Sequence, residues 1–319
     1  MSGLKDRQRA GFALRYDILV SERATGDDRM LRTVFIAFGG ARQLCIRLYE
    51  ELEERKIVFV ELPELILQEA KQLAGYVSSQ NRKLSECMLV TDNPILLSEA
   101  QKLGMPCAGY VKEDCVESLP VSCRYVIAGE ESLRYRVILE VYQRYLGLPL
   151  TIVETQRLIL RELTEEDIER MREISRKESV REYIYDIPLN QNEAYEFIRA
   201  YIRRVYPFYG YGYWGIFLKD NGALIGRCGL KEGSVTEQGS AELGYLLAPE
   251  YTGAGYVREA VNAVIQYAFQ ELQLKSLTAR IREDNYRSLA VAEACGMVSE
   301  GVIQTSDEVY HLYTVYRSR

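Results

Sequence analysis

Residues 242–261 of the chain have the sequence ELGYLLAPEYTGAGYVREAV. An apolar strand runs into a turn that contains Gly253 and Gly255, and this turn opens directly into an amphipathic helix. Such a turn exposes unpaired backbone N–H groups at the positive end of the helix dipole, where a pyrophosphate group binds favourably. By itself, the stretch predicts a strand–turn–helix unit with a site for a phosphate-bearing ligand.

The bulk composition excludes several classes of protein. The chain has 319 residues, 47 % of them apolar, so two domains with a core each are expected. A net charge of -6 argues against nucleic-acid binding. No stretch approaches the roughly 18–20 apolar residues that span a membrane, and no signal peptide is evident. The seven cysteines form no Cys-x-x-Cys pair and there is one histidine, so we expect a reduced, cytoplasmic protein without disulfides or a metal site.

The pattern along the chain predicts three segments. Residues 1–30 are polar and without a clear period, as in a tail or an additional element. Residues 31–147 alternate short apolar strands with helices, which indicates a mostly parallel, Rossmann-like sheet. Gly147-Leu148-Pro149 is typical of a helix stop and a linker. Residues 151–319 then open with a strand predicted over 151–163 and a helix start at Thr164, followed by acidic residues.

The second half resembles the GNAT family of acetyl-CoA-dependent N-acyltransferases, and more narrowly its branch of ribosomal-protein N-terminal acetyltransferases. The resemblance rests on the order of blocks at residues 154–167, 212–217, 224–230, 242–261, 285–288 and 296–301. It implies a GNAT-fold mixed sheet, so that the whole chain combines an α/β domain with an α+β domain. It also implies acetyl-CoA as cofactor and direct acetyl transfer to an amine, which is either a protein N-terminus or a small molecule.

The same resemblance implies residues for the cofactor. The strand over residues 241–247 would bond the pantetheine arm through its backbone, and it includes Leu246 and Leu247. The following turn would wrap the pyrophosphate with Thr252, Gly253, Ala254, Gly255, Tyr256 and Val257. Two positions depart from the common pattern, which has Arg or Gln in place of Thr252 and Gly or Ala in place of Val257. The main-chain contacts tolerate the first change, whereas the bulk of Val257 could crowd the cofactor.

Acetyl transfer requires a group that takes the amine proton and a group that protonates the departing thiolate. Glu242 lies on the strand before the turn, where related enzymes often carry a base, and a salt-bridged structural glutamate is the equal alternative. Glu308 and Asp307 are weaker candidates. The tyrosine acid of many relatives is replaced by Ala292, but Asn285 and Ser288 fit the Asn-x-x-Ser spacing of the ribosomal-protein branch.

On a helix, Asn285 and Ser288 would share one face. In that interpretation Asn285 binds pantetheine and Ser288 is the proton donor. The alternative makes Asn285 a helix N-cap and Ser288 a residue of the first turn, and both interpretations can hold together.

An aromatic run precedes the strand that borders the acceptor site in the family. Its side chains could line a groove for a peptide terminus or a small amine, although core packing is the commoner role for any one of them. The residues that we expect at the substrate are Tyr211, Tyr213 and Trp214.

The first half resembles the later part of a haloacid-dehalogenase-type phosphatase domain, on the sequence MLVTDNP at residues 88–94. The nucleophilic aspartate of that family has no counterpart, because residues 35–40 contain no acid. Without it, no aspartyl-phosphate can form. We therefore expect a degenerate domain, in which Asp92 begins a helix and binds no metal.

Three roles stay open for this domain: binding a small ligand, positioning the substrate, or forming a homodimer. For the whole chain, the alternatives to an N-acetyltransferase are a non-catalytic acyl-CoA sensor and, less well supported, a phosphatase–acetyltransferase fusion.

Overall fold

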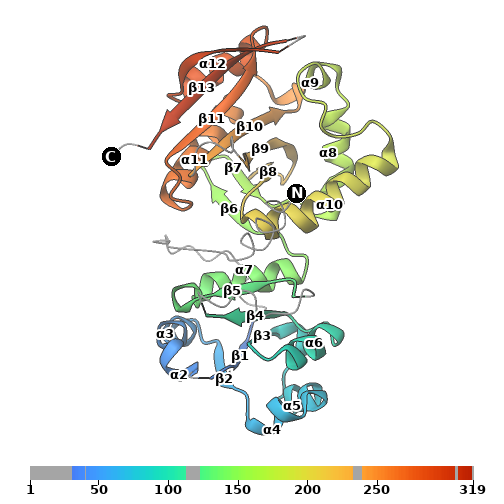
Figure 1. The fold of residues 1–319 in the computed structure, drawn as a ribbon. Coiled ribbons are helices and arrows are strands. Elements are labelled where there is room, and N and C mark those ends of the chain that lie inside the picture. Colours follow the sequence, from blue (N-terminus) through green and yellow to red (C-terminus); the bar gives the residue numbers. More distant parts are fainter. Residues whose placement is uncertain (1–30, 40, 113–122, 233–238, 306–307, 318–319) are drawn as a thin grey trace, which may run out of the picture. The chain divides into compact units, whose positions relative to one another are not determined.

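The computed structural model describes residues 31–39, 41–112, 123–232, 239–305 and 308–317. The segment 1–30, predicted as a tail, and Asp307 lie outside these residues. The described chain separates into two compact units, one ending at Leu148 and the other beginning at Pro149 (Figure 1). None of the described helices is long and apolar enough to cross a membrane.

The N-terminal unit is built on a five-stranded, all-parallel sheet of order β2-β1-β3-β4-β5. This doubly wound order confirms the predicted parallel α/β sheet. Its strands are β1 (Thr33–Ala37), β2 (Val58–Glu61), β3 (Cys87–Thr91), β4 (Cys107–Val111) and β5 (Val126–Ala128). Its helices are α2 (Ala41–Leu44), α3 (Ile46–Glu54), α4 (Glu64–Gln68), α5 (Leu73–Ser79), α6 (Pro94–Lys102) and α7 (Tyr135–Tyr145).

Helices cover both faces of this sheet. Residues of α3 and α7 form one buried cluster with alternate strand residues such as Val34 and Ile36. Residues of α4, α5 and α6 form a second cluster with the intervening strand residues, such as Phe35 and Ala37. Successive strand residues point to opposite faces, which explains why the inner strands β1, β3 and β4 are buried along their whole length and mostly apolar.

Helix α6 begins immediately after strand β3. The side chain of Asn93 accepts hydrogen bonds from the backbone N–H groups of Ile95 (2.9 Å) and Leu96 (3.2 Å), and Pro94 occupies the first helical position. Asn93 is therefore the N-cap, and Asp92 precedes it at the end of the strand.

Replacing this cap should measurably weaken the N-terminal unit. We expect Asn93→Ala to lower the free energy of unfolding by about 1 kcal/mol, because two N–H groups of α6 lose their acceptor. Urea unfolding followed by circular dichroism measures the difference. Asn93→Asp retains the acceptor oxygen and should lose less, and equal stability of the alanine variant and the wild type would contradict the prediction.

The C-terminal unit contains an eight-stranded mixed sheet of order β12-β13-β11-β10-β9-β8-β7-β6. Its strands are β6 (Thr151–Glu154), β7 (Leu158–Arg161), β8 (Tyr213–Leu218), β9 (Leu224–Glu232), β10 (Ser240–Leu247), β11 (Ser276–Arg282), β12 (Val298–Gln304) and β13 (Val309–Tyr316). Its helices are α8 (Ile168–Ser175), α9 (Glu178–Arg181), α10 (Gln191–Tyr209), α11 (Tyr256–Gln270) and α12 (Tyr286–Ala294). Residues of α11 and α12 pack on one face, and residues of α8 and α10 pack on the other.

The single strand predicted over residues 151–163 is wrong, because the chain reverses within it. Strands β6 and β7 form an antiparallel hairpin, and residues 155–157 make the turn. The Thr155 hydroxyl closes this turn by accepting a hydrogen bond from the N–H of Leu158 (2.9 Å). Thr164 caps the following turn as expected, through a capping box with Asp167.

Candidate functional site

The glycine turn links strand β10 to helix α11. Gly253 and Gly255 have φ angles of 86° and 80°, in the left-handed region that favours glycine. Gly255 is the N-cap residue of α11, and no side chain caps the helix. The first N–H groups of α11 therefore lack a side-chain acceptor, which is the condition for binding an anion at this end.

The two unusual residues of the turn lie in different surroundings. Thr252 is exposed, and its hydroxyl donates a hydrogen bond to the carbonyl of Pro249 (2.8 Å). Val257 is half-buried and packs against the core of the unit. The contacts of Val257 therefore provide a packing reason for its size.

Strands β10 and β11 separate from each other next to this turn. Strands β10 and β11 pair over only three residues, Ser240–Glu242 with Ser276–Thr278. Strand β10 nevertheless stays paired with β9 as far as Leu247. Successive residues of a strand direct their backbone N–H and C=O groups to opposite edges, so every second residue from 243 to 247 directs them toward β11. Since β11 has separated from β10 here, these groups have no partner within the two strands, both of which are fully described. The structure thus leaves a free backbone edge on the strand that carries Leu246 and Leu247.

Helix α12 begins after β11, on the other side of this parting. The Asn285 side chain accepts a hydrogen bond from the N–H of Ser288 (3.2 Å), so the predicted N-cap is present. The hydroxyl of Tyr245, on β10, donates to the carbonyl of Ser288 (2.8 Å). Sequence analysis did not single out Tyr245, since its approach to α12 depends on how the sheet and helix pack.

Glu242 forms ion pairs with two cations from the neighbouring strands. Its Oε1 lies 2.9 Å from the Lys231 ammonium, and its Oε2 lies 3.0 Å from the Arg280 guanidinium. The Glu242 side chain is only 16 % exposed, while those of Lys231 and Arg280 are 43 % and 52 % exposed. The salt-bridged interpretation of Glu242 thus has direct support, although each carboxylate oxygen keeps a second lone pair for a proton.

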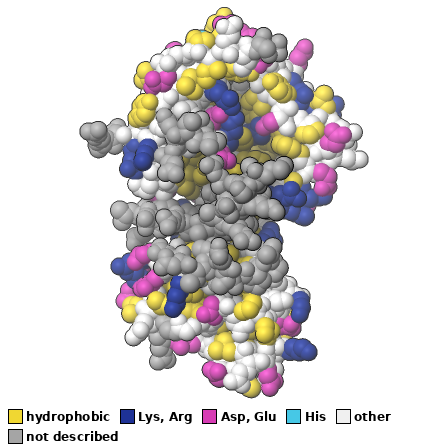
Figure 2. Space-filling model, in the orientation of Figure 1, with side chains coloured by type: hydrophobic (Ala, Val, Ile, Leu, Met, Phe, Trp, Pro, Cys, Tyr) yellow, Lys and Arg dark blue, Asp and Glu magenta, His cyan; other side chains and the backbone are white. Residues whose placement is uncertain are grey.

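Basic side chains gather in a hollow on this face of the unit, over strands β10 and β11, with hydrophobic side chains around them (Figure 2). The register pairs Lys231 with Glu242 and places Arg280 two residues beyond Thr278, where β10 and β11 part. This face of the sheet therefore carries charged as well as apolar side chains.

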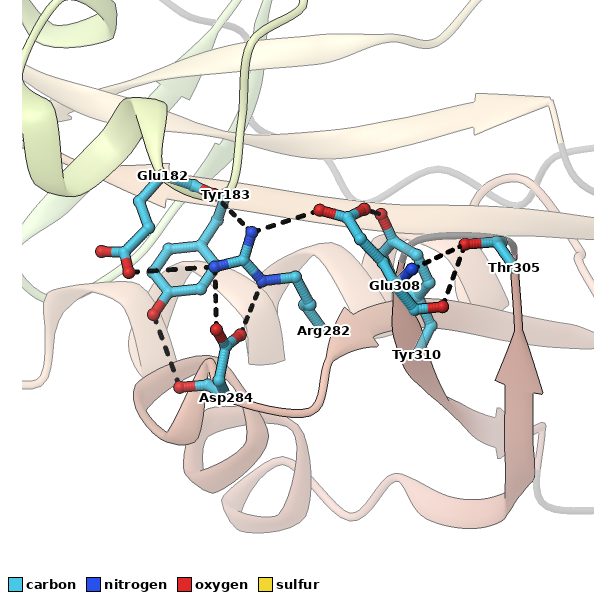
Figure 3. A network of polar contacts seen from close by, with 7 residues as sticks. All are labelled: Glu182, Tyr183, Arg282, Asp284, Thr305, Glu308 and Tyr310. Atoms are coloured by element: carbon cyan, nitrogen blue, oxygen red, sulfur yellow. Dashed lines mark hydrogen bonds and ion pairs between the residues drawn. The ribbon is translucent and has the colours of Figure 1, made fainter.

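Glu308 belongs to a network around Arg282 (Figure 3). Arg282 makes a bidentate pair with Asp284 (2.6 and 2.9 Å) and also donates to Glu308 (3.3 Å), which accepts a further bond from Tyr310. The guanidinium lies 4.4 Å from the centre of the Tyr183 ring. These contacts join the chain after α9 to β11 and β13, and they favour a structural role for Glu308.

The predicted aromatic residues divide into two groups. Trp214 is fully buried and packs edge-on against Tyr267, with ring centres 5.4 Å apart, which favours core packing. Tyr211 and Tyr213 are half-buried, and the Tyr213 ring lies 4.7 Å from the guanidinium carbon of Arg227. Arg227 is itself paired with Asp186 (2.5 Å).

The backbone of Tyr213 is held by two other tyrosines. Its N–H donates to the Tyr201 hydroxyl, and its carbonyl accepts from the Tyr206 hydroxyl, both at 2.6 Å. Burial raises the pKa of Tyr201 to about 12. These two hydroxyls therefore fix the start of β8 and are poor candidates for proton transfer.

Arg157, in the turn between β6 and β7, contacts the glycine turn and was missed by sequence analysis. It donates to the carbonyl of Ala254 (2.9 Å) and forms an ion pair with Glu259 on α11 (2.7 Å). Burial acts to raise the pKa of the Glu259 carboxyl, but hydrogen bonds from Thr155 and Arg157 outweigh it and hold the pKa below its usual range. A polar depression of about 380 Å³ lies beside this contact and is lined by Thr155, Gln156, Arg157, Gly255, Arg258, Glu259 and Asn262.

Comparisons with known proteins agree with this geometry. The sequence model of the acetyltransferase (GNAT) domain matches residues 157–298, within the C-terminal unit. The uncharacterized N-acetyltransferase YoaA of Bacillus subtilis (strain 168) is 30 % identical over 154 residues, which are 48 % of this chain and 86 % of YoaA. The chain belongs to the GNAT acetyltransferase family. It is therefore an acetyltransferase, and acetyl-CoA is its cofactor, as in the family at large.

Two further relatives give the extent of the similarity. YkkB of B. subtilis is 36 % identical over 89 residues, 28 % of this chain, and the match spans about half (52 %) of YkkB. A solved structure described as a putative ribosomal-protein-serine acetyltransferase from Vibrio cholerae has 27 % identity and a TM-score of 0.46, covering 53 % of this GNAT protein and 98 % of that chain. Family membership favours an enzyme over the non-catalytic sensor.

Proposed function

We propose that this GNAT protein transfers an acetyl group from acetyl-CoA directly to an amine, either a protein N-terminus or a small molecule. One observation carries the proposal: the uncapped N-terminus of α11 and the free edge of β10 lie on one continuous stretch of chain. The N–H groups from Thr252 to Val257 would hold the pyrophosphate. The backbone near Leu246 and Leu247 would hold the pantetheine arm.

The remaining chemistry is assigned to two side chains. Glu242 takes a proton from the acceptor amine, directly or through water, as the nitrogen–carbon bond forms. Ser288 donates a proton to the sulfur as the carbon–sulfur bond breaks, and Asn285 binds the pantetheine next to it. Tyr211 and Tyr213 are proposed to line the acceptor site. The half-buried positions of Asn285 and Ser288 at the start of α12 support these roles.

For the N-terminal unit we propose a haloacid-dehalogenase-like domain without phosphatase chemistry, covering residues 31–147, followed by the acetyltransferase domain over 151–319. Strand β1 and the two described residues after it carry no carboxylate. Burial raises the pKa of the Asp92 carboxyl, which does not favour a charged metal ligand. Homodimer formation stays one of the proposed roles of this unit. For the whole protein we propose a cytoplasmic location, which the six described cysteines support because all six are free thiols.

Thermal-shift measurements with acetyl-CoA and free CoA test the cofactor site. Both ligands should raise the melting temperature of the full chain, and the absence of a shift with either would refute the site. Acetyl transfer to a panel of amines then identifies the acceptor class. The panel should contain peptides with free N-termini, the same peptides with blocked N-termini, and small amines such as spermidine.

Direct transfer predicts that no acetylated enzyme accumulates. Cys295 is the cysteine closest to the proposed site in sequence, but it is buried, and burial raises the pKa of its thiol to about 11. A thiol with this pKa is a poor nucleophile near neutral pH. We expect Cys295→Ala to keep its kcat, with stability changed by about 1 kcal/mol. Intact-mass measurement after incubation with acetyl-CoA alone should show the unmodified mass, and an acetyl adduct on Cys295 would contradict direct transfer.

A further inference from the structure

Arg157 contacts three residues: Ala254 in the glycine turn, and Tyr256 and Glu259 in the first turn of α11. Its Nη1 donates to the carbonyl of Ala254 (2.9 Å), and its Nε donates to the Glu259 carboxylate (2.7 Å). Its guanidinium carbon lies 4.4 Å from the centre of the Tyr256 ring. The planar guanidinium is thus held by a carbonyl, a carboxylate and an aromatic ring together.

Glu259 is the anchor of this arrangement. Its Oε1 accepts hydrogen bonds from the Thr155 hydroxyl (2.6 Å) and from the backbone N–H of Arg157 (2.9 Å), and its side chain is 19 % exposed. The β6–β7 hairpin is therefore fastened to the first turn of α11 through both backbone and side chain. This fastening determines where the Arg157 guanidinium lies.

The bond to Ala254 has a consequence for the next residue. The carbonyl of Ala254 and the N–H of Gly255 belong to the same peptide unit, and in a trans peptide they point in opposite directions. A guanidinium that holds this carbonyl on the hairpin side therefore directs the Gly255 N–H away from the hairpin. Gly255 has a positive φ and no Cβ, so this peptide would otherwise rotate easily.

We propose that Arg157 is a positioning residue for the cofactor: it orients the Gly255 peptide so that its N–H points to the pyrophosphate of acetyl-CoA. This inference rests on the proposed cofactor site. Because Glu259 neutralises the guanidinium at 2.7 Å, the role is one of orientation rather than charge attraction. Thr252 supplies no positive charge for the pyrophosphate. Binding therefore depends on the orientation of the backbone N–H groups of the turn, which Arg157 holds from the hairpin side.

The first test is Arg157→Gln in the full chain. We expect the Kd for CoA and the KM for acetyl-CoA to rise roughly 10- to 100-fold, as for loss of a hydrogen bond to a charged group, with kcat at saturation unchanged. Acetyl-pantetheine lacks the pyrophosphate, so its kcat/KM should be the same for the variant and the wild type. An equal loss with both donors, or no loss with acetyl-CoA, would overturn the inference.

Two further variants separate orientation from charge. Arg258→Gln removes an equal charge from the same depression, and we expect it to leave the Kd for CoA close to that of the wild type. Glu259→Gln releases Arg157 from its counter-charge; orientation predicts weaker CoA binding, whereas charge attraction predicts tighter binding. Tighter binding by Glu259→Gln, or an equal loss in Arg258→Gln, would refute the proposal.

Melting temperatures of all variants identify any that fail to fold. Should Arg157→Gln fail to fold, Glu259→Gln provides the decision alone. If the wild type does not bind CoA, the cofactor site itself is refuted. If the wild type and Arg157→Gln bind CoA equally tightly, the cofactor site stands and only the role of Arg157 is refuted.

Discussion

Glu242→Gln is expected to lower kcat by about 10²- to 10⁴-fold, with little change in the KM for acetyl-CoA. The amide has nearly the shape of the carboxylate but cannot take the amine proton. The proposed cofactor contacts are made by backbone groups of other residues, so cofactor affinity should persist. Steady-state kinetics with an accepted amine measures both constants.

The ion pairs of Glu242 require controls of their own, because the amide leaves Lys231 and Arg280 without their shared partner. Arg280→Gln removes one of these partners and keeps the carboxylate, so it should lower kcat much less than Glu242→Gln does. Glu308→Gln examines the other described acid and should retain turnover. If Glu242→Gln turns over normally with an unchanged melting temperature, Glu242 is a structural salt-bridge residue and not the base.

Ser288→Ala is expected to lower kcat by a similar factor, about 10²- to 10⁴-fold, since the departing thiolate loses its proton donor. This substitution is structurally conservative. The hydrogen bonds of Ser288 with Asn285 and Tyr245 both use its backbone: its N–H donates to the Asn285 side chain, and its carbonyl accepts from the Tyr245 hydroxyl. The hydroxyl can therefore be removed while the N-cap and the contact with β10 remain.

The dependence on the leaving group distinguishes a proton donor from a structural residue. An acetyl thioester of an aromatic thiol releases a more stable thiolate, so the deficit of Ser288→Ala should shrink with that donor. Tyr245→Phe is the matched control, because it removes the hydroxyl on β10 that donates to the Ser288 carbonyl. A loss of kcat in Tyr245→Phe with normal turnover in Ser288→Ala would move the acid role to Tyr245.

Several features of the fold could be predicted because they are local. The parallel strands of the N-terminal unit are short apolar runs, and the structure has the predicted alternation of these strands with helices. Asn285 and Thr164 could be assigned as caps because a cap bonds a backbone group within three residues. The left-handed glycines of the turn follow from the same kind of short-range constraint.

The errors and omissions concern contacts between distant segments. The strand predicted over 151–163 is a hairpin, because an apolar period does not show where a chain reverses. Trp214 lies in the core, since helices cover both faces of the sheet at β8, and this covering comes from segments distant in the sequence. The two ion pairs of Glu242 involve residues of β9 and β11, so the residues next to Glu242 in the sequence could not reveal them.

The sequence by itself determined the alternation of strands and helices and the glycine turn with its uncapped helix, because backbone preferences and capping act over a few residues. Only the tertiary structure decided what surrounds that turn. Arg157 reaches Glu259 across 102 positions of the chain, and Tyr245 reaches Ser288 across 43. Such contacts depend on strand register and on the packing of helices against the sheet, which no local pattern encodes.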